Sequence, residues 1–294
     1  MGTFWCEMAW LGGDTATPSV LVETAGDLIT RVTPGVPCPP SSTRLAGLTL
    51  PGLANAHSHA FHRALRGRTQ VGTGSFWTWR DQMYTAAARL DPDSYFRLAR
   101  AVYGEMVLAG VTCVGEFHYL HHGAGGVAYA EPNAMADALI AAAGEAGLRI
   151  TLLDTCYLRG GIGVEPNEVQ QRFSDGDALS WAARASALTS RTSNDCRIGA
   201  AIHSVRAVDP ASMQIVVAWQ AQHDAVLHAH VSEQKAENQQ CIDAYGLTPT
   251  ALLAERGALT ERFTAVHATH LAGSDIGLYG AHGCTVCMCP TTER

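Results

Sequence analysis

The chain has 294 residues, of which 47% are hydrophobic, and its formal net charge at pH 7 is −7. A chain of this length can bury one large core, or a large domain with a small one beside it. The negative charge and the lack of basic clusters argue against a nucleic-acid partner, and no apolar run is long enough to predict a membrane span.

The cysteines are nine in number, which is odd, and they are scattered along the chain. This pattern predicts reduced and mostly buried thiols rather than a disulfide framework. The first residues also lack the basic segment and adjoining apolar segment that mark a secretion signal. We therefore expect a cytoplasmic protein.

Residues 1–49 differ in pattern from the rest of the chain. The runs FWCEMAWL (4–11) and SVLVE (19–23) have the length of strands, and the turn-forming stretches GG, TPG and PCPPSS interrupt this region. We predict short strands that form a small β-layer rather than a unit of a barrel.

From residue 48 onward, strand-like apolar runs alternate with helical patterns. This repeated order predicts parallel strands joined by crossover helices. One helix is expected to carry Pro132 in its first turn, where proline is tolerated. The expected strands are 47–55, 111–117, 149–157, 197–204, 225–231, 263–270 and 284–289, and the expected helices are 91–110, 131–147, 209–222 and 274–283.

The seven expected strands are one fewer than a (β/α)8 barrel contains. The chain ends at TTER, directly after the seventh of these strands. We predict an α/β fold with a (β/α)8 TIM-type barrel over residues 50–294 that lacks its eighth strand. A barrel closed with seven strands and an open sheet are the alternatives.

Histidines gather where the expected strands end. If residues 48–55 form a strand, His57 and His59 leave its carboxyl end on the same side. Chemistry in barrels sits at that end of the sheet. An isolated H-x-H is also typical of a surface turn, but convergence from several strands favours a catalytic metal. The histidines at or just beyond strand ends are 57, 59, 62, 118, 121, 122, 203, 230 and 267.

Several motifs in this order resemble the metal-dependent amidohydrolases and, within them, the formimidoylglutamate deiminases. The resemblance extends from about residue 48 to the last residue. It implies a barrel of the amidohydrolase kind, with residues 1–49 as a small, incomplete β-sandwich part. The motifs are NAHSHAFHRALRG, GSFWTWRDQMY, GEFHYLHH, HSVRAV, HVSEQ, VHATHL and CPTTER.

The resemblance implies a metal centre and two catalytic side chains. His57, His59 and His230 would bind one divalent metal ion, zinc in the family, which leaves a position open for a water. Glu233 resembles the proton shuttle, and His267 would stabilise the tetrahedral centre. In the family a further ligand, an Asp, follows an eighth strand, which is expected to lie beyond this chain.

The substrate implied by the resemblance, N-formimino-L-glutamate, carries two carboxylates and an amidine-like head. Arg206 resembles the family's carboxylate clamp, and Arg80 and Tyr119 are further candidates for binding the substrate. His62 stands where relatives often have Gln, near the substrate head, so its charge would depend on pH. Arg80 and Tyr119 could instead be ordinary residues outside the site.

Other residues have simpler interpretations. Ser232 could cap a helix that contains Glu233, and His228 is expected to be a hydrogen-bonded interior residue. We expect His270 to lie off the site. Trp77 and Trp79 could pack a lid or a dimer contact. We expect no role in binding metal for Asp224, Asp275, Cys284, Cys287 and Cys289.

The resulting hypothesis is a hydrolase that acts on the carbon–nitrogen bond of a linear amidine. It would convert N-formimino-L-glutamate to N-formyl-L-glutamate and ammonia in histidine degradation, as a cytoplasmic homodimer without nucleic-acid or membrane partners. One alternative is another amidohydrolase deaminase, of the guanine or chlorotriazine type. A second is an inactive, truncated fragment that binds metal, since a missing strand would leave two sheet edges unpaired.

Overall fold

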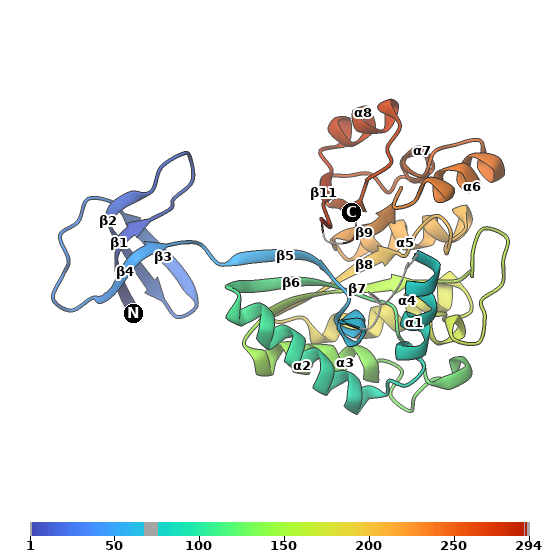
Figure 1. Cartoon of the computed structure of the whole chain (residues 1–294), viewed down its shortest axis with the longest axis horizontal. Helices are drawn as coiled ribbons and strands as arrows, with labels where there is room; N and C mark the ends of the chain where they lie inside the picture. The colour runs from blue at the N-terminus through green and yellow to red at the C-terminus, as the bar shows by residue number, and fades with distance from the viewer. Residues whose placement is uncertain (1, 68–75, 291, 293–294) are drawn as a thin grey trace. The chain divides into compact units, whose positions relative to one another are not determined.

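The structure is a computed structural model that describes residues 2–67, 76–290 and 292. Contacts within the chain separate it into two compact units, residues 1–53 and 54–294 (Figure 1). None of the described helices is long and apolar enough to cross a membrane.

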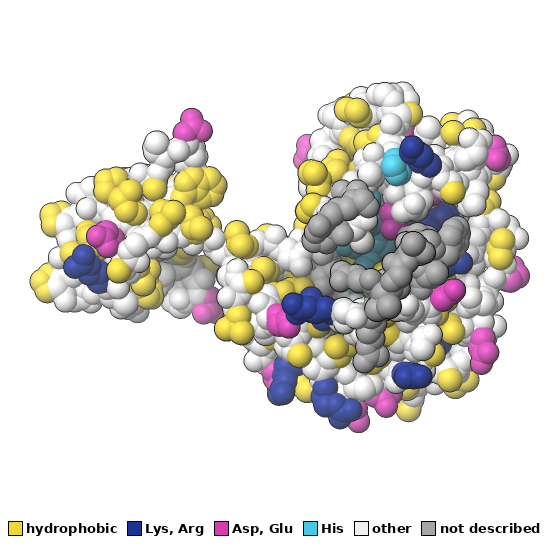
Figure 2. Space-filling view, in the orientation of Figure 1, with side chains coloured by type: hydrophobic (Ala, Val, Ile, Leu, Met, Phe, Trp, Pro, Cys, Tyr) yellow, Lys and Arg dark blue, Asp and Glu magenta, His cyan; other side chains and the backbone are white. Residues whose placement is uncertain are grey.

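The first unit is a four-stranded sheet in the order β3-β2-β1-β4. Strand β1 pairs antiparallel with β2 and parallel with β4. Cys6, Ala9 and Val20 form a small buried core in this unit, and other apolar side chains of the unit are exposed (Figure 2). The strands are β1 (Gly2–Ala9), β2 (Thr17–Ala25), β3 (Leu28–Thr33) and β4 (Thr43–Thr49).

The expectation of one strand over residues 47–55 was wrong. Leu48 lies in β4 of the first sheet, and the barrel begins with a separate strand, β5 (Leu53–Ser58). Pro51 lies between them, and proline has no N–H to donate to a sheet ladder. His57 is therefore inside β5, and His59 follows its end.

The second unit contains a seven-stranded sheet, counted over the described residues, in the order β11-β10-β9-β8-β7-β6-β5. Neighbouring strands are consecutive in sequence, and every described pair is parallel, as in a barrel built from β-α units. This confirms the predicted fold class. The remaining strands are β6 (Val111–His118), β7 (Arg149–Cys156), β8 (Cys196–Ile202), β9 (Leu227–Val231), β10 (Phe263–His267) and β11 (Thr285–Cys287).

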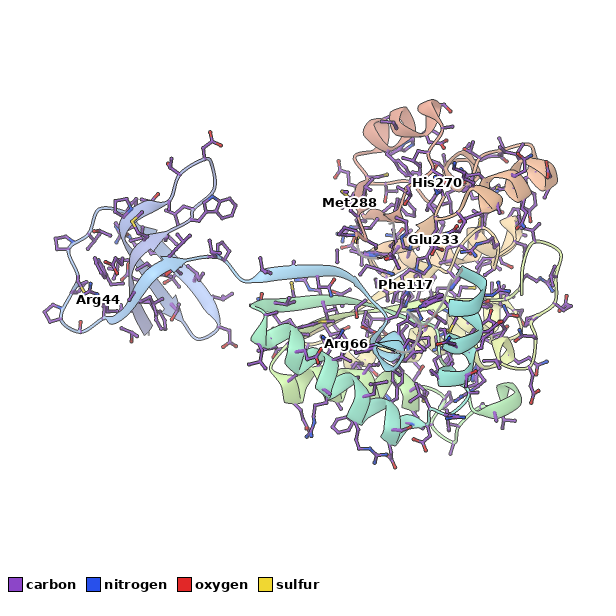
Figure 3. All side chains as sticks on the ribbon, in the orientation of Figure 1. Arg44, Arg66, Phe117, Glu233, His270 and Met288 are labelled. Atoms are coloured by element: carbon purple, nitrogen blue, oxygen red, sulfur yellow. The ribbon has the colours of Figure 1, made fainter. Side chains whose placement is uncertain are left out.

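Helices follow the strands and cover the outside of this sheet (Figure 1). Large side chains such as Phe117, Trp181 and Phe263 are fully buried in the core, and side chains fill the interior (Figure 3). The α-helices are α1 (Phe76–Ala87), α2 (Pro92–Leu108), α3 (Ala134–Ala146), α4 (Ala178–Leu188), α5 (Pro210–Gln222), α6 (Lys235–Tyr245), α7 (Pro249–Glu255) and α8 (Gly273–His282), and the 3-10 helices are η1 (Ala60–Leu65), η2 (Ala124–Gly126), η3 (Gln170–Phe173) and η4 (Thr189–Arg191).

The helix starts show why these segments fold as predicted and where one prediction failed. Asp91 and Ser94 form a capping box at the start of α2, and Asp209 caps α5. Helix α3, however, begins at Ala134, so Pro132 precedes it rather than occupying its first turn. The chain makes a turn there, in which the Ala134 N–H donates to the carbonyl of Glu131 at 3.0 Å.

Candidate active site

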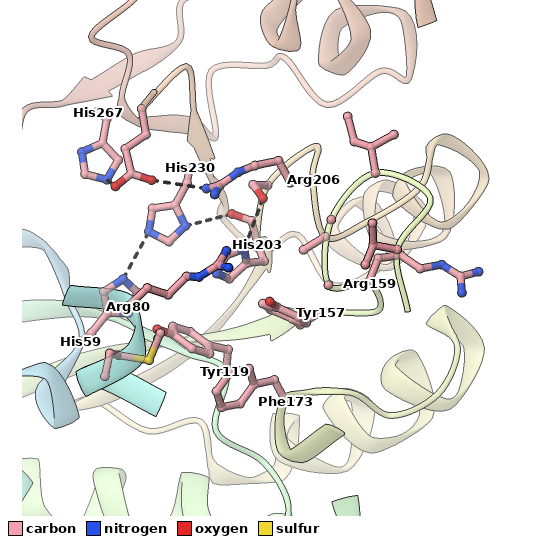
Figure 4. A pocket seen from close by; sticks show the side chains of 18 of the residues that line it. His59, Arg80, Tyr119, Tyr157, Arg159, Phe173, His203, Arg206, His230 and His267 are labelled. Carbon is pink, nitrogen blue, oxygen red and sulfur yellow. Dashed lines mark hydrogen bonds and ion pairs between the residues drawn. The ribbon is translucent and has the colours of Figure 1, made fainter. Parts of the chain in front are cut away.

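Three histidine side chains meet at the carboxyl ends of the strands. His57 and His59 come from the end of β5, and His230 comes from β9. Figure 4 shows His59 and His230 facing each other. The Nε2 atom of His230 lies 3.2 Å from Nε2 of His59 and 3.3 Å from Nε2 of His57. The structure thus brings together the three residues that were predicted as metal ligands.

Backbone carbonyls fix the ring orientation of two of these histidines. His59 Nδ1 donates to the carbonyl of Phe117 at 2.8 Å, and His230 Nδ1 donates to the carbonyl of His203 at 2.9 Å. A carbonyl only accepts, so the proton of each neutral ring is on Nδ1 and the lone pair is on Nε2. The two Nε2 lone pairs therefore face each other, which is unfavourable unless a cation lies between them.

The donor set fits a divalent metal ion such as zinc. Tetrahedral coordination at a metal–nitrogen distance of about 2.0–2.1 Å places ligand nitrogens roughly 3.3 Å apart, which matches the separations of 3.2 and 3.3 Å. The buried Nδ1 of His57 has no hydrogen-bond partner among the described residues. Metal-binding histidines usually donate this second N–H, often to water.

Burial keeps these rings in the neutral form that binds metal. The pKa of His59 is lowered to about 3, mainly by burial and to a smaller extent by the neighbouring His267, against the raising effect of the Phe117 carbonyl. The pKa of His57 and of His230 is also well below the usual value, first through burial and then through nearby histidines. The triad is therefore unprotonated at neutral pH.

Glu233 lies beside the histidines, just after β9. Its Oε1 is 3.8 Å from Nε2 of His267, and its Oε2 is 3.3 Å from Nη2 of Arg206. His267 ends β10 with a φ of 71°, a left-handed conformation that non-glycine residues adopt at a cost. This arrangement brings the two predicted catalytic side chains to the same side of the triad.

The interpretation of Ser232 as a helix cap was wrong. Helix α6 begins at Lys235, and its N-cap position is Gln234, which makes no side-chain capping bond. Ser232 has a φ of 52°, and its buried Oγ has no hydrogen-bond partner among the described residues. Glu233 therefore precedes helix α6 and does not lie in its first turn, where the capping interpretation had placed it.

A cavity of about 740 Å³ opens above the triad. All of the predicted substrate-binding residues line it, and Figure 4 shows Arg80 and Arg206 pointing into it. Burial lowers the pKa of Arg206, but the Glu237 and Glu233 carboxylates offset this and leave the pKa above its usual value. The predicted binding residues in this wall are His62, Arg80, Tyr119 and Arg206.

One side of the cavity is aromatic. The His62 Nε2 and Tyr119 Oη atoms are 2.8 Å apart, and the Trp79 ring lies 5.1 Å from the His62 ring, centre to centre. The Arg80 guanidinium lies over the Tyr84 ring, 5.6 Å from its centre. Trp77 was also predicted to pack in a lid or at a dimer contact, but its side chain is not part of the described structure.

Some site residues received no role from the sequence. His203 and Tyr157 line the cavity, with ring centres 4.5 Å apart. Glu237 lies 3.8 Å from Arg206. His203 could have been predicted as a site residue, because it directly follows the strand β8. Glu237 could not have been predicted in this way, because it lies within the polar helix α6 and not at the end of a strand.

Two further histidines lie off the cavity wall. His270 is not among the lining residues, as expected. His228 is buried in β9, but the hydrogen bond expected for its ring is not found at Nδ1, which has no partner among the described residues. Its pKa falls to about 4 because of burial, so the ring is neutral at pH 7.

Comparison with known proteins gives a match of residues 48–294 to the model of the amidohydrolase family. Among curated proteins, the chain is similar to a formimidoylglutamate deiminase from Pseudomonas aeruginosa, with 38% identity over 257 residues, which is 85% of this chain and 56% of that protein. The chain thus spans about half the length of this relative.

Solved structures show the same architecture. An amidohydrolase from Brucella melitensis superimposes with a TM-score of 0.91 at 34% identity, over all of this chain and 66% of that one. The atrazine chlorohydrolase from Arthrobacter aurescens, solved with zinc, gives a TM-score of 0.84 at 21% identity, over 97% of this chain and 65% of that one. The second likeness concerns the fold alone.

Proposed function

This chain belongs to the amidohydrolase family, and we propose that it catalyses the metal-dependent hydrolytic deimination of N-formimino-L-glutamate. The products would be N-formyl-L-glutamate and ammonia, as in histidine degradation. The observation that carries the proposal is the pairing of the histidine triad with Arg80 and Arg206 in one cavity. The 38% identity to a formimidoylglutamate deiminase supports it.

The metal would be held by His57, His59 and His230, whose Nε2 atoms converge. Such a cation, which we propose to be zinc, supplies a polarised water that is nucleophilic at neutral pH. The chain's own contribution is the orientation of the ligands. The carbonyls of Phe117 and His203 hold two of the rings with their lone pairs toward the centre.

Glu233 and His267 would handle the proton and the developing charge. Glu233 would take a proton from the attacking water as the carbon–oxygen bond forms and pass it to the imino nitrogen. The remaining hydroxyl proton would reach the same nitrogen through Glu233 as the carbon–oxygen double bond forms and the carbon–nitrogen bond breaks, so that ammonia leaves. Its Oε1 faces the triad side of the site beside His267. His267 would donate a hydrogen bond to the tetrahedral centre.

The arginines would bind the two substrate carboxylates. Arg206 is buried to a large extent and held by Glu233 and Glu237, so its guanidinium is presented in one orientation. Arg80 reaches the cavity from α1, packed over Tyr84. Tyr119 and His62, joined by their 2.8 Å contact, would face the formimidoyl head.

A second candidate is hydrolytic deamination of an aromatic amine, as of guanine or a chlorotriazine. It is favoured by the aromatic side of the cavity, which could stack a flat ring. Such a substrate has no carboxylates and so gives no purpose to the two arginines. The aromatic residues of the wall are Trp79, Tyr84, Tyr119, Tyr157 and Phe173.

Ammonia release from zinc-loaded protein separates these candidates. We expect ammonia from N-formimino-L-glutamate and none from guanine, and we expect the His230→Ala variant to release none. Turnover of guanine that is insensitive to Arg206→Gln would support the aromatic amine instead. Zinc bound without any turnover would support a binding role without catalysis. The expected homodimer stays a prediction, which the mass in solution would test.

A further inference from the structure

A second cluster of buried titratable side chains lies outside the cavity, where β6 and β7 meet α4. His118 and Asp154 are paired in register on the adjacent strands β6 and β7, so their side chains leave the sheet on the same face. His121 lies in the loop that follows β6. Donor atoms of these three buried residues lie within 4.8 Å of one another, and none of the three lines the cavity.

The two histidines present nitrogen lone pairs that the described residues do not use. His121 Nε2 donates to the carbonyl of Thr155 at 2.9 Å, so the unprotonated nitrogen is Nδ1. This buried Nδ1 has no hydrogen-bond partner among the described residues and lies 4.0 Å from Oδ2 of Asp154. Two acceptors that face each other in a buried site require a cation or a proton donor between them.

His118 also lacks hydrogen-bond partners among the described residues, and it lies next to His121. Its side chain is 1% exposed, and neither ring nitrogen has a hydrogen-bond partner among the described residues. Its ring centre is 4.8 Å from that of His121. A buried imidazole without any partner loses the hydrogen bonds it would have in water, which is unfavourable unless a ligand replaces them.

The charges of the cluster also leave room for a cation. Arg184 contacts Asp154 at 2.8 and 2.9 Å and Asp175 at 2.7 and 2.9 Å, so one guanidinium serves two buried carboxylates. Burial, followed by the charge of Arg184, lowers the pKa of His121 to about 4, so its ring is neutral. His122 bonds to Asp175 at 3.0 Å, not to Asp154.

We propose that His118, His121 and Asp154 bind a second divalent transition-metal ion, which ties the loop after β6 to β7. Two imidazoles and a carboxylate suit zinc and its neighbours. Each carboxylate oxygen has two lone pairs, so Asp154 can keep Arg184 and still bind a metal. Closing the donors to about 2.0–2.2 Å from a metal requires side-chain shifts on the order of 1 Å.

The outer contacts of this cluster repeat those of the candidate active site. The Thr155 carbonyl fixes the tautomer of His121, as the Phe117 carbonyl does for His59. Arg184 orients the carboxylate of Asp154. Ligands held in this way from a second layer are typical of built metal sites. The site would therefore stabilise the barrel wall beside the cavity without taking part in the reaction.

Zinc stoichiometry tests the proposal without any activity assay. The protein is stripped of metal, reloaded with zinc and freed of excess, and zinc per chain is measured by elemental mass spectrometry. We expect two equivalents in the wild type, one in His57→Ala/His59→Ala and one in His118→Gln/His121→Gln. The control His122→Gln, which changes the neighbouring histidine bonded to Asp175, should keep two.

The outcomes are distinct from those of the proposed function. One equivalent in the wild type together with none in His57→Ala/His59→Ala would overturn the second site and leave a buried water in the cluster. If His118→Gln/His121→Gln fails to fold, cobalt(II) added to His57→Ala/His59→Ala provides the answer. Visible absorption of cobalt with nitrogen ligands is expected, and its absence would contradict the site, whatever substrate the enzyme turns over.

Discussion

The Nε2 atoms of His59 and His230 lie 3.2 Å apart, while the Nδ1 atom of each ring is bound to a backbone carbonyl. Both carbonyls therefore turn a lone pair toward the same point. The two residues are far apart in sequence, at the ends of β5 and β9, and the barrel brings them together. This relationship is the basis of the metal centre and of the predictions that depend on it.

Replacing one ligand should remove the metal from this centre. We expect His59→Ala to lower the zinc content by one equivalent per chain and to abolish turnover, because a metal held by two nitrogens loses much of its affinity. Zinc content and ammonia release are measured on the same sample. The control is His270→Ala, which changes a histidine off the cavity wall. An unchanged zinc content in His59→Ala would contradict the triad.

Glu233→Gln should separate catalysis from binding. Gln keeps the shape of the side chain but cannot take a proton, so we expect kcat to fall by about 10²–10⁴-fold with little change in KM. Zinc content should stay at the wild-type value, because Glu233 is not one of the converging ligands. A Glu233→Gln variant with wild-type kcat would exclude Glu233 as the proton shuttle.

Arg206→Gln should act mainly on substrates that carry carboxylates. Losing a charged hydrogen-bonding partner costs about 2–3 kcal/mol, so kcat/KM for N-formimino-L-glutamate should fall about 30- to 150-fold. Arg262→Gln serves as the matched control, since Arg262 is paired with Asp224 on the surface. Equal losses in the two variants would argue against a carboxylate clamp at Arg206.

Glu116 gives a prediction on stability and pH. Its side chain is fully buried and accepts the Ala60 N–H at 2.6 Å. Burial raises its pKa to about 7, against the opposing effect of the hydrogen bond from Ala60. The folded state therefore binds more protons than the unfolded chain between the unfolded pKa and about 7, so this group favours folding at low pH and loses that effect as pH rises.

Glu116→Gln keeps the acceptor for Ala60 and removes the charge. We expect it to raise the free energy of unfolding by up to about 3 kcal/mol at pH values above 7, and to have little effect near the unfolded pKa of Glu. Urea unfolding across this pH range measures the difference. Glu168→Gln, at an exposed position, is measured in parallel as the control. A pH-independent effect of Glu116→Gln would contradict the raised pKa.

The order of elements and the three converging histidines could be predicted from the sequence because both are consequences of local patterns. Apolar runs between helical segments fix the strands, and residues at strand ends meet at one edge of a parallel sheet. His57, His59 and His230 were found in this way, and the structure brings them together.

The details that failed depend on contacts between distant segments. The break at Pro51 separates a strand of the first sheet from a strand of the barrel, and both parts are apolar in sequence. The carbonyl of His203 that orients His230 is a backbone atom, which no residue pattern reveals. The cluster of His118, His121 and Asp154 requires the register of β6 against β7 to be known.

The identity of the products tests the central claim most directly. Zinc-loaded protein is incubated with N-formimino-L-glutamate that carries carbon-13 in the formimidoyl group, and the reaction is followed by nuclear magnetic resonance. We predict that the label appears in N-formyl-L-glutamate as ammonia is released, and that the label stays in the substrate with His230→Ala. Label in formamide, or an unchanged substrate in the presence of fully zinc-loaded wild-type protein, would contradict the proposed deimination.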